Sequence, residues 1–252
     1  MSGEARRQAA RQRIAERRAA EATARAAADR RRRTVVGGVV AAVVLVVALV
    51  VVVVVQTQRT STSADAATPP GVTDGYAFAV GSADAPVTMD VYEDFQCPVC
   101  AQLEETSGAT IAQLVDEGTV QVRYHGMAFL DRASTTRYST RALNAAAVVA
   151  ESGTGAFRAF HDLLFAQQPA EGTAGLSDDE LVGLATQAGA DGESVESGIR
   201  DLRYEEWVAA ATDRASEDGV TGTPTVFVDD EQLDSGQLTP DGITAAVAAA
   251  RA

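Results

Sequence analysis

The segment that most constrains the fold of this chain is Cys97-Pro98-Val99-Cys100, which holds the only two cysteines among the 252 residues. Two intervening residues allow the sulfurs to close one small disulfide and to reopen it. So short a loop adds little stability, because the stabilisation by a disulfide grows with loop length. We therefore interpret the pair as a redox centre, and any fold must keep both sulfurs in reach of a reaction partner.

The position of the dithiol predicts different roles for its two sulfurs. It directly follows a predicted strand and opens a predicted helix, with Pro98 at the first helical position, where a missing N–H is harmless. Cys97 then lies at the helix N-terminus, where free N–H groups and the helix dipole favour a thiolate. Cys100 lies one turn further and is shielded. We predict that Cys97 attacks and Cys100 resolves.

The N-terminal quarter of the chain is predicted to anchor it in a membrane. Residues 1–34 form an Arg-rich segment, which carries 11 of the 21 basic residues of the chain. Residues 35–55 follow without a charge and would span ~31 Å as a helix at ~1.5 Å per residue, a bilayer's apolar thickness. The basic side stays in the cytoplasm, which predicts a single-pass cell-membrane protein.

A cleaved signal peptide is the alternative, since Ala64-Asp65-Ala66 resembles a cleavage site. The charged and the apolar segments are both longer than those of signal peptides, which favours a retained anchor. Residues 56–74 are rich in Thr, Ser, Ala, Pro and Gly and are predicted to form a flexible linker. The domain beyond it is expected in an oxidising extracytoplasmic compartment.

The outer domain, predicted at 75–252, combines strand and helix patterns. It is strongly acidic, with most of the 35 acidic residues of the chain, and this charge excludes binding of nucleic acid through its phosphates. Alternating or short apolar runs predict strands at 76–80, 87–92, 120–124 and 225–228. Helical patterns cover 98–117, 134–151, 155–168, a segment capped by Ser177, 193–217 and a last helix from Pro240. The prediction is an α/β fold with a helical insertion at about 134–218.

Two motifs resemble the DsbA-like branch of the thioredoxin superfamily. One is Phe95-Gln96-Cys97-Pro98-Val99-Cys100 after its strand, and the other is the segment 219–228, Gly-Val-Thr-Gly-Thr-Pro-Thr-Val-Phe-Val. They stand about 125 residues apart in the expected order, and the segment 160–165 of the insertion is also similar. The resemblance implies a thioredoxin-like fold over 75–252.

The same resemblance implies roles for the second motif. Pro224 would follow a cis peptide bond, and its loop would pack against the dithiol. The backbone of Thr223 would pair with an extended substrate strand. Pro98 and Val99, between the cysteines, would modulate the reactivity of the site.

Two positions depart from the family pattern. Many relatives carry a buried Glu or Asp six residues before the first cysteine, placed to shuttle the proton of the resolving thiol, and here that position is Val91. Asp90 and Glu93 are expected to point elsewhere because the strand alternates. Val99 stands where strongly oxidising relatives often have His, and an apolar side chain cannot donate a hydrogen bond to the thiolate.

Metal sites are the main alternative chemistry. The dithiol could form half of a zinc site with His125 and His161, but these histidines lack the usual paired spacing. His161 lies on the apolar stripe of its helix, which favours a core histidine over a role near the thiols. Asp229-Asp230-Glu231 is expected to be a solvated turn and not a calcium site. We predict no metal and no cofactor.

These features predict an extracytoplasmic thiol-disulfide oxidoreductase that introduces disulfides into unfolded, cysteine-containing exported proteins. The resemblance implies a membrane quinone-linked oxidase that reoxidises the dithiol, since the chain has no second cysteine pair. A reductase or isomerase on the same fold remains an alternative. So does a non-catalytic module that senses redox state or binds peptides at the Thr223-Pro224 loop.

Overall fold

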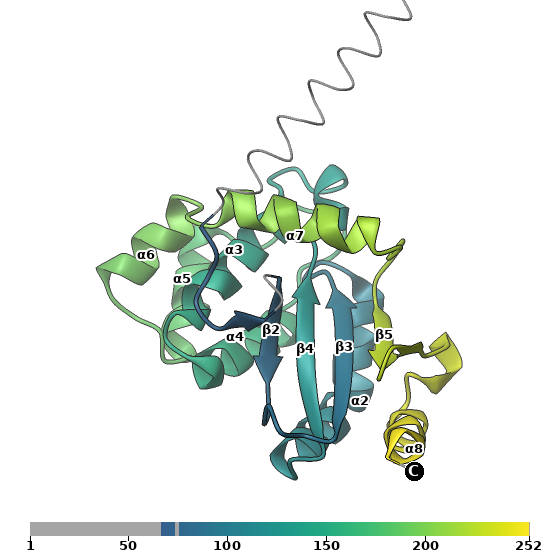
Figure 1. Ribbon diagram of the computed structural model, residues 1–252. Coiled ribbons are helices and arrows are strands. Elements are labelled where there is room, and N and C mark those ends of the chain that lie inside the picture. Colours follow the sequence, from purple (N-terminus) through teal and green to yellow (C-terminus); the bar gives the residue numbers. More distant parts are fainter. Residues whose placement is uncertain (1–66, 74–75, 252) are drawn as a thin grey trace, which may run out of the picture. The chain divides into compact units, whose positions relative to one another are not determined.

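A six-stranded mixed sheet organises the part of the chain that the computed structural model describes, residues 67–73 and 76–251. Its strand order is β1-β2-β4-β3-β5-β6, and β3 pairs parallel with β4 and antiparallel with β5 (Figure 1). The strands are β1 (Val72–Thr73), β2 (Ala77–Val80), β3 (Val87–Glu93), β4 (Val120–Gly126), β5 (Thr225–Val228) and β6 (Glu231–Gln232). The sheet thus begins at β1, inside the segment predicted as linker.

Helices cover both faces of this sheet (Figure 1). They are α2 (Pro98–Asp116), α3 (Tyr138–Ala150), α4 (Thr154–Ala166), α5 (Asp178–Gln187), α6 (Glu193–Arg200), α7 (Glu205–Glu217) and α8 (Pro240–Ala250), with short 3-10 turns η1 (Phe129–Arg132) and η2 (Ser235–Gln237). α2 and α4 pack on one face, and α7 lies against the other. α3 contacts α4, α5, α6 and α7 and so forms the centre of the helical insertion.

The alternation of β3 explains why this strand lies in the middle of the core. Val87, Met89 and Val91 point to the α2 face and have no exposed surface. Every second residue of a strand points to the same face. Glu93 therefore shares the α2 face with these apolar residues, whereas Asp90 points to the α7 face and contacts Arg123.

The long helix predicted at 193–217 is wrong, because the structure breaks it between α6 and α7. Leu202 adopts a left-handed backbone with φ 52°. The buried Asn144 side chain from α3 satisfies both free ends: its amide nitrogen donates to the carbonyls of Gly198 and Ile199, and its oxygen accepts from the N–H of Tyr204 at 2.8 Å. A polar residue distant in sequence thus ends one helix and starts the next.

The predicted turn after β5 is confirmed. Asp229 and Asp230 have φ 44° and 67°, a conformation that Asp tolerates better than most residues. The Asp229 carboxylate accepts a hydrogen bond from the backbone N–H of Thr88 at 2.8 Å. This carboxylate therefore ties the turn to the start of β3.

Within the described residues, no helix is long and apolar enough to cross a membrane. The predicted span at 35–55 lies outside that part of the chain, and so do the Arg-rich segment and most of the predicted linker.

Candidate active site

The dithiol lies where β3 and the following turn lead into α2. Cys97 is the N-cap of α2 with an extended backbone (φ −79°, ψ 116°), and Pro98 is the first helical residue, as predicted. Cys97 is 6% exposed and Cys100 is 1% exposed, and both are free thiols. Val99 lies between the two cysteines and is a large apolar side chain that is 54% exposed to solvent. Both cysteines are therefore buried, Cys100 more fully than Cys97, and Val99 is the exposed side chain between them.

The loop before β5 packs against Cys97, although it lies more than 120 residues away in the chain. The Thr223–Pro224 peptide bond is cis, as the resemblance implied. The Cys97 thiol donates to the Thr223 carbonyl oxygen over 3.3 Å. β5 lies next to β3 in the sheet, and this pairing brings the loop to the start of α2.

The surroundings of the two sulfurs shift their pKa values in opposite directions. A hydrogen bond with the Cys100 thiol is the main cause that lowers the pKa of Cys97 to about 6. Burial opposes this shift, while a side-chain hydrogen bond with Thr223 and the N–H groups of Cys100 and Val99 support it. Burial, together with the neighbouring Cys97, raises the pKa of Cys100 far above its ordinary range. Near neutral pH, Cys97 is the thiolate and Cys100 the thiol.

A buried carboxylate that the sequence analysis did not single out shapes the turn before Cys97. Asp94 has no exposed surface, and it accepts from the N–H of Gln96 at 2.9 Å, the N–H of Leu130 at 3.0 Å and the Ser139 hydroxyl at 2.6 Å. Burial raises its pKa to about 6. Its backbone carbonyl accepts from the N–H of Cys97. Asp94 therefore links the dithiol loop to η1 and α3.

The helical insertion also contacts the dithiol loop from the side of α4. Gln168, just after α4, donates from its amide to the Cys97 carbonyl oxygen over 3.0 Å. The Gln96 amide donates to the carbonyls of Ala170 and Thr173 in the loop before α5. The insertion therefore helps to hold the backbone on both sides of the attacking sulfur.

The expectation that Glu93 points away from the dithiol face is wrong. Glu93 is 2% exposed on the α2 face, the same face as Val91, and its carboxylate lies 2.9 Å from Nε2 of His161 on α4. Residues 91 and 93 differ by two, so they share a face of an alternating strand. His161 is 1% exposed, and it is a core histidine with a charged partner. Burial opposes its charge, but Glu93 outweighs that effect and holds the pKa of the imidazole well above its ordinary value.

A third ionisable group completes this cluster. Glu104 lies on α2, and among the described residues Glu93, Glu104 and His161 are the group whose potential ligand atoms lie within 4.8 Å of one another. Such a set could hold a cation in principle, but Nε2 of His161 is already bound to Glu93. Neither cysteine belongs to a group of this kind in the described part of the chain.

His125 lies away from the thiols. It is on the α7 face, where its Nε2 lies 2.7 Å from the Asp90 carboxylate and its ring stacks on Tyr92 at 4.2 Å. The two histidines thus bind carboxylates on opposite faces of the sheet, and the structure does not bring them together with the dithiol.

Comparison with known proteins agrees with this geometry. A family model described as Thioredoxin matches residues 73–249. The chain belongs to the thioredoxin family. Reduced DsbA from Mycobacterium tuberculosis is 32% identical, with a TM-score of 0.57 over 70% of this chain and 100% of that one. The reduced disulfide bond oxidoreductase DsbG of the same organism is 33% identical, with a TM-score of 0.59 over 72% and 97% of the two chains.

The thioredoxin-like, mixed α/β fold predicted from the sequence is therefore confirmed, and the homologues are DsbA-like thiol-disulfide oxidoreductases. Among curated proteins, the Na(+)/H(+) antiporter NhaA 3 of Salinispora tropica is 33% identical over 170 residues. That match covers 68% of this chain and 24% of the relative. The chain thus spans about a quarter of the length of the first curated relatives.

Proposed function

We propose that this protein is a membrane-tethered, extracytoplasmic thiol-disulfide oxidase, which transfers the Cys97–Cys100 disulfide to unfolded, cysteine-containing exported proteins. The observation that carries this proposal is the pair of opposed thiols: a Cys97 with its pKa lowered to about 6 beside a buried, protonated Cys100. A stabilised thiolate favours the reduced dithiol, so the disulfide form becomes the better oxidant.

The chemistry needs two exchange steps. A substrate thiolate attacks Sγ of Cys97, the Cys97–Cys100 bond breaks, and Cys100 leaves. A second substrate thiolate then attacks the substrate sulfur of the mixed disulfide, and Cys97 leaves as a stable thiolate. The substrate loses two electrons, and the dithiol gains them. The exposed Val99 and the backbone of Thr223 beside Cys97 are the groups we assign to substrate contact.

The anchor is part of the proposal. The uncharged segment 35–55 would span the membrane, with residues 1–34 in the cytoplasm and the dithiol domain outside. Reoxidation would then require a separate membrane partner, for which a quinone-linked oxidase is suitable, because this chain holds no other cysteines. Mass spectrometry of the native protein should find peptides from residues 1–33. A mature N-terminus near Ala67 would contradict the retained anchor.

The direct test is turnover on a reduced, unfolded protein that regains activity only when its disulfides form. The oxidised protein should restore that activity stoichiometrically, and it should do so catalytically when a disulfide reagent is supplied. Faster reduction of disulfide substrates than oxidation of thiols would favour the reductase or isomerase. Binding of extended peptides without any exchange would favour the non-catalytic module.

A further inference from the structure

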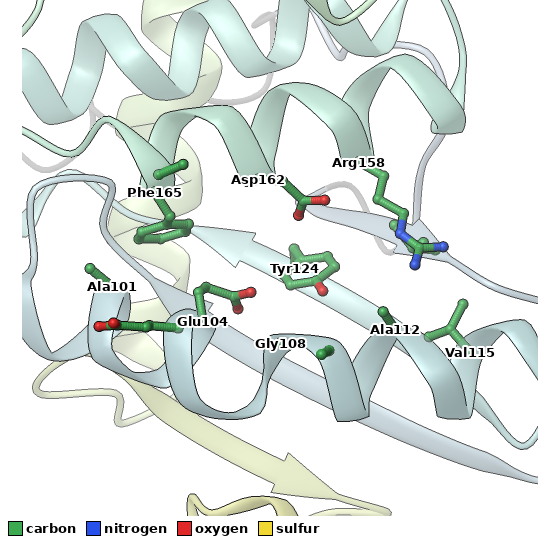
Figure 2. A pocket seen from close by; sticks show the side chains of 13 residues that line it. Ala101, Glu104, Gly108, Ala112, Val115, Tyr124, Arg158, Asp162 and Phe165 are labelled. Atoms are coloured by element: carbon green, nitrogen blue, oxygen red, sulfur yellow. The ribbon is translucent and has the colours of Figure 1, made fainter.

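A cavity of about 610 Å³ lies between α2 and α4. α2 contributes small residues, which leave this space open: Ala101, Gly108, Ala109 and Ala112. Figure 2 shows Glu104 on α2 facing the ring of Tyr124, with Asp162 and Phe165 of α4 on the other side. Pockets that bind small ligands usually measure ~300–1,000 Å³, so the cavity can take a long side chain of another molecule.

The charged groups that line this cavity are mostly negative. Glu104, Glu105 and Asp162 contribute carboxylates. Arg158 is the cation among the described lining residues, and its guanidinium lies 2.8 Å from the carboxylate of Asp116. The cavity therefore attracts cations and repels carboxylates and phosphates.

Glu104 is a poorly stabilised carboxylate at the edge of the core. The residue is half-buried, and its Oε1 is buried without a hydrogen-bond partner among the described residues. A buried carboxylate oxygen without a partner is unfavourable, and a cation beside the same carboxylate offsets part of that cost. Glu104 therefore favours a cationic ligand over a neutral one.

The walls beside these carboxylates are aromatic and aliphatic. Tyr124 on β4 and Phe165 on α4 line the cavity, together with Val80 and Val115. Lysine and arginine combine a charged end with an apolar stem, which can lie along such walls. A cation within ~6 Å of the face of an aromatic ring is also attracted to it. The lining therefore suits a basic side chain better than a small hydrated ion.

The cavity begins close to the dithiol. Ala101 lies one helical turn after Cys97, and Gln168, just after α4, donates from its amide to the Cys97 carbonyl oxygen. Glu104 is seven residues after Cys97, which corresponds to ~10 Å along α2 at ~1.5 Å per residue. An extended peptide covers that distance with about three residues at ~3.3 Å each. A substrate that reacts at Cys97 can therefore place a nearby side chain in the cavity.

We propose that the cavity between α2 and α4 binds a basic side chain of the substrate, a lysine or arginine about three residues from the cysteine that reacts with Cys97. The inference rests on the proposed function, and it names a preferred class of substrate: exported proteins with a positive charge close to the reacting cysteine. The charged end of that side chain lies beside the carboxylate of Glu104, and its stem lies between Tyr124 and Phe165. The site binds and orients the substrate, and no covalent bond changes there.

The ionisation of Glu104 makes this binding depend on pH. Burial is the main cause that raises the pKa of Glu104 to about 7, and Glu93 on β3 and Asp162 on α4 raise it further, whereas His161 lowers it. Tyr124 stays neutral, because burial raises its pKa well above the ordinary value. A cation binds better to a charged carboxylate than to a neutral one. The preference for a basic side chain should therefore increase as the pH rises through about 7.

The test compares two reduced peptides with one central cysteine, which carry either lysine or its uncharged analogue norleucine three residues before and three residues after it. The rate at which each peptide opens the disulfide of the full-length oxidised protein is measured by acid quench and mass spectrometry, and is divided by the thiolate fraction of the peptide. At pH 8 the lysine peptide should react roughly tenfold faster with the wild type, a conservative value for a hydrogen bond to a charged group. The ratio of the two rates should be smaller at pH 6.

Two variants should remove the preference for lysine. Glu104→Gln removes the charge, and Ala112→Met fills the cavity while every carboxylate stays in place. In both, the ratio of the two rates should fall to about one. This ratio reports the cavity even where a variant changes the reactivity of the dithiol, because such a change affects both peptides alike.

The matched control is Glu117→Gln, which removes an equal charge at the far end of α2, outside the cavity. It should keep the wild-type ratio. A wild-type ratio near one, a preference that survives in Glu104→Gln or Ala112→Met, or an equal loss in Glu117→Gln would overturn the inference. A wild-type protein that reacts with neither peptide at any pH would instead refute the proposed function.

Discussion

The Thr223 side chain is one of the groups that lower the pKa of Cys97, and its removal offers a measurable test of oxidising power. Thr223→Val keeps the shape of the side chain and removes its hydroxyl. A hydrogen bond to a charged group contributes ~1.5–3 kcal/mol, and one pKa unit corresponds to ~1.4 kcal/mol. The pKa of Cys97, about 6 in the wild type, should therefore rise by roughly one to two units in the variant.

The effect on the reduction potential follows from the fraction of thiolate. At pH 7, a rise of the Cys97 pKa from about 6 to roughly 7.5 lowers the thiolate fraction from about nine-tenths to about a quarter. The reduced form then loses roughly 1.2 kcal/mol, which makes the couple about 25 mV more reducing. Thiolate stabilisation is lost as the pH falls through the lower pKa, so the two proteins should converge below about pH 5.

The assay combines thiolate absorbance against pH with equilibration in glutathione buffers at several pH values. Thr225→Val is the control, because the Thr225 hydroxyl donates to the Gly222 carbonyl and not to Cys97. The control should retain the wild-type potential. An unchanged Cys97 pKa in Thr223→Val, or a difference in potential that persists at pH 4.5, would refute this reasoning.

Three further predictions concern other residues of the site. Cys100→Ala should accumulate mixed disulfides with substrates on non-reducing gels, whereas Cys97→Ala should not, and equal accumulation would contradict the assigned roles. Val99→His should raise the reduction potential by roughly 30–60 mV, because an added hydrogen bond to the thiolate contributes ~1.5–3 kcal/mol; an unchanged or lower potential would show that Val99 does not set it. Burial raises the pKa of Asp94 to about 6, so this residue stabilises the fold most below pH ~4 and loses that contribution as the pH rises through 6. In Asp94→Asn the free energy of unfolding should therefore depend less on pH between pH ~4 and 6. An unchanged pH dependence in denaturant titrations would contradict this.

The fold was largely predictable because local patterns agree with the tertiary contacts. Pro98 at the first turn of α2, the capping box of Ser177 and Glu180, and the apolar alternation of β3 all form as expected. The break between α6 and α7 was not predictable, because the helical pattern continues through it. It depends on the Asn144 side chain, which lies about 60 residues earlier and satisfies backbone groups on both sides.

The ionisable residues of the site were harder to predict than its thiols. In the family pattern the buried acid stands at the position of Val91, but strand alternation places Glu93 on the same buried face. The partnership of Glu93 with His161 joins residues 68 positions apart, and only packing of α4 on the sheet creates it. No sequence motif marks Glu104 or Asp94, because what distinguishes these two carboxylates is their burial in the folded protein.

The reduction potential of the Cys97–Cys100 couple tests the central proposal most directly. It would be measured by equilibrating the protein at pH 7 in glutathione buffers of known ratio and counting free thiols by mass. The lowered pKa of Cys97 predicts an oxidising reduction potential between about −230 and −120 mV. The potential should stay below the upper limit because the apolar Val99 cannot donate a hydrogen bond to the thiolate. A value near the roughly −270 mV of thioredoxin would contradict the oxidase and favour the reductase.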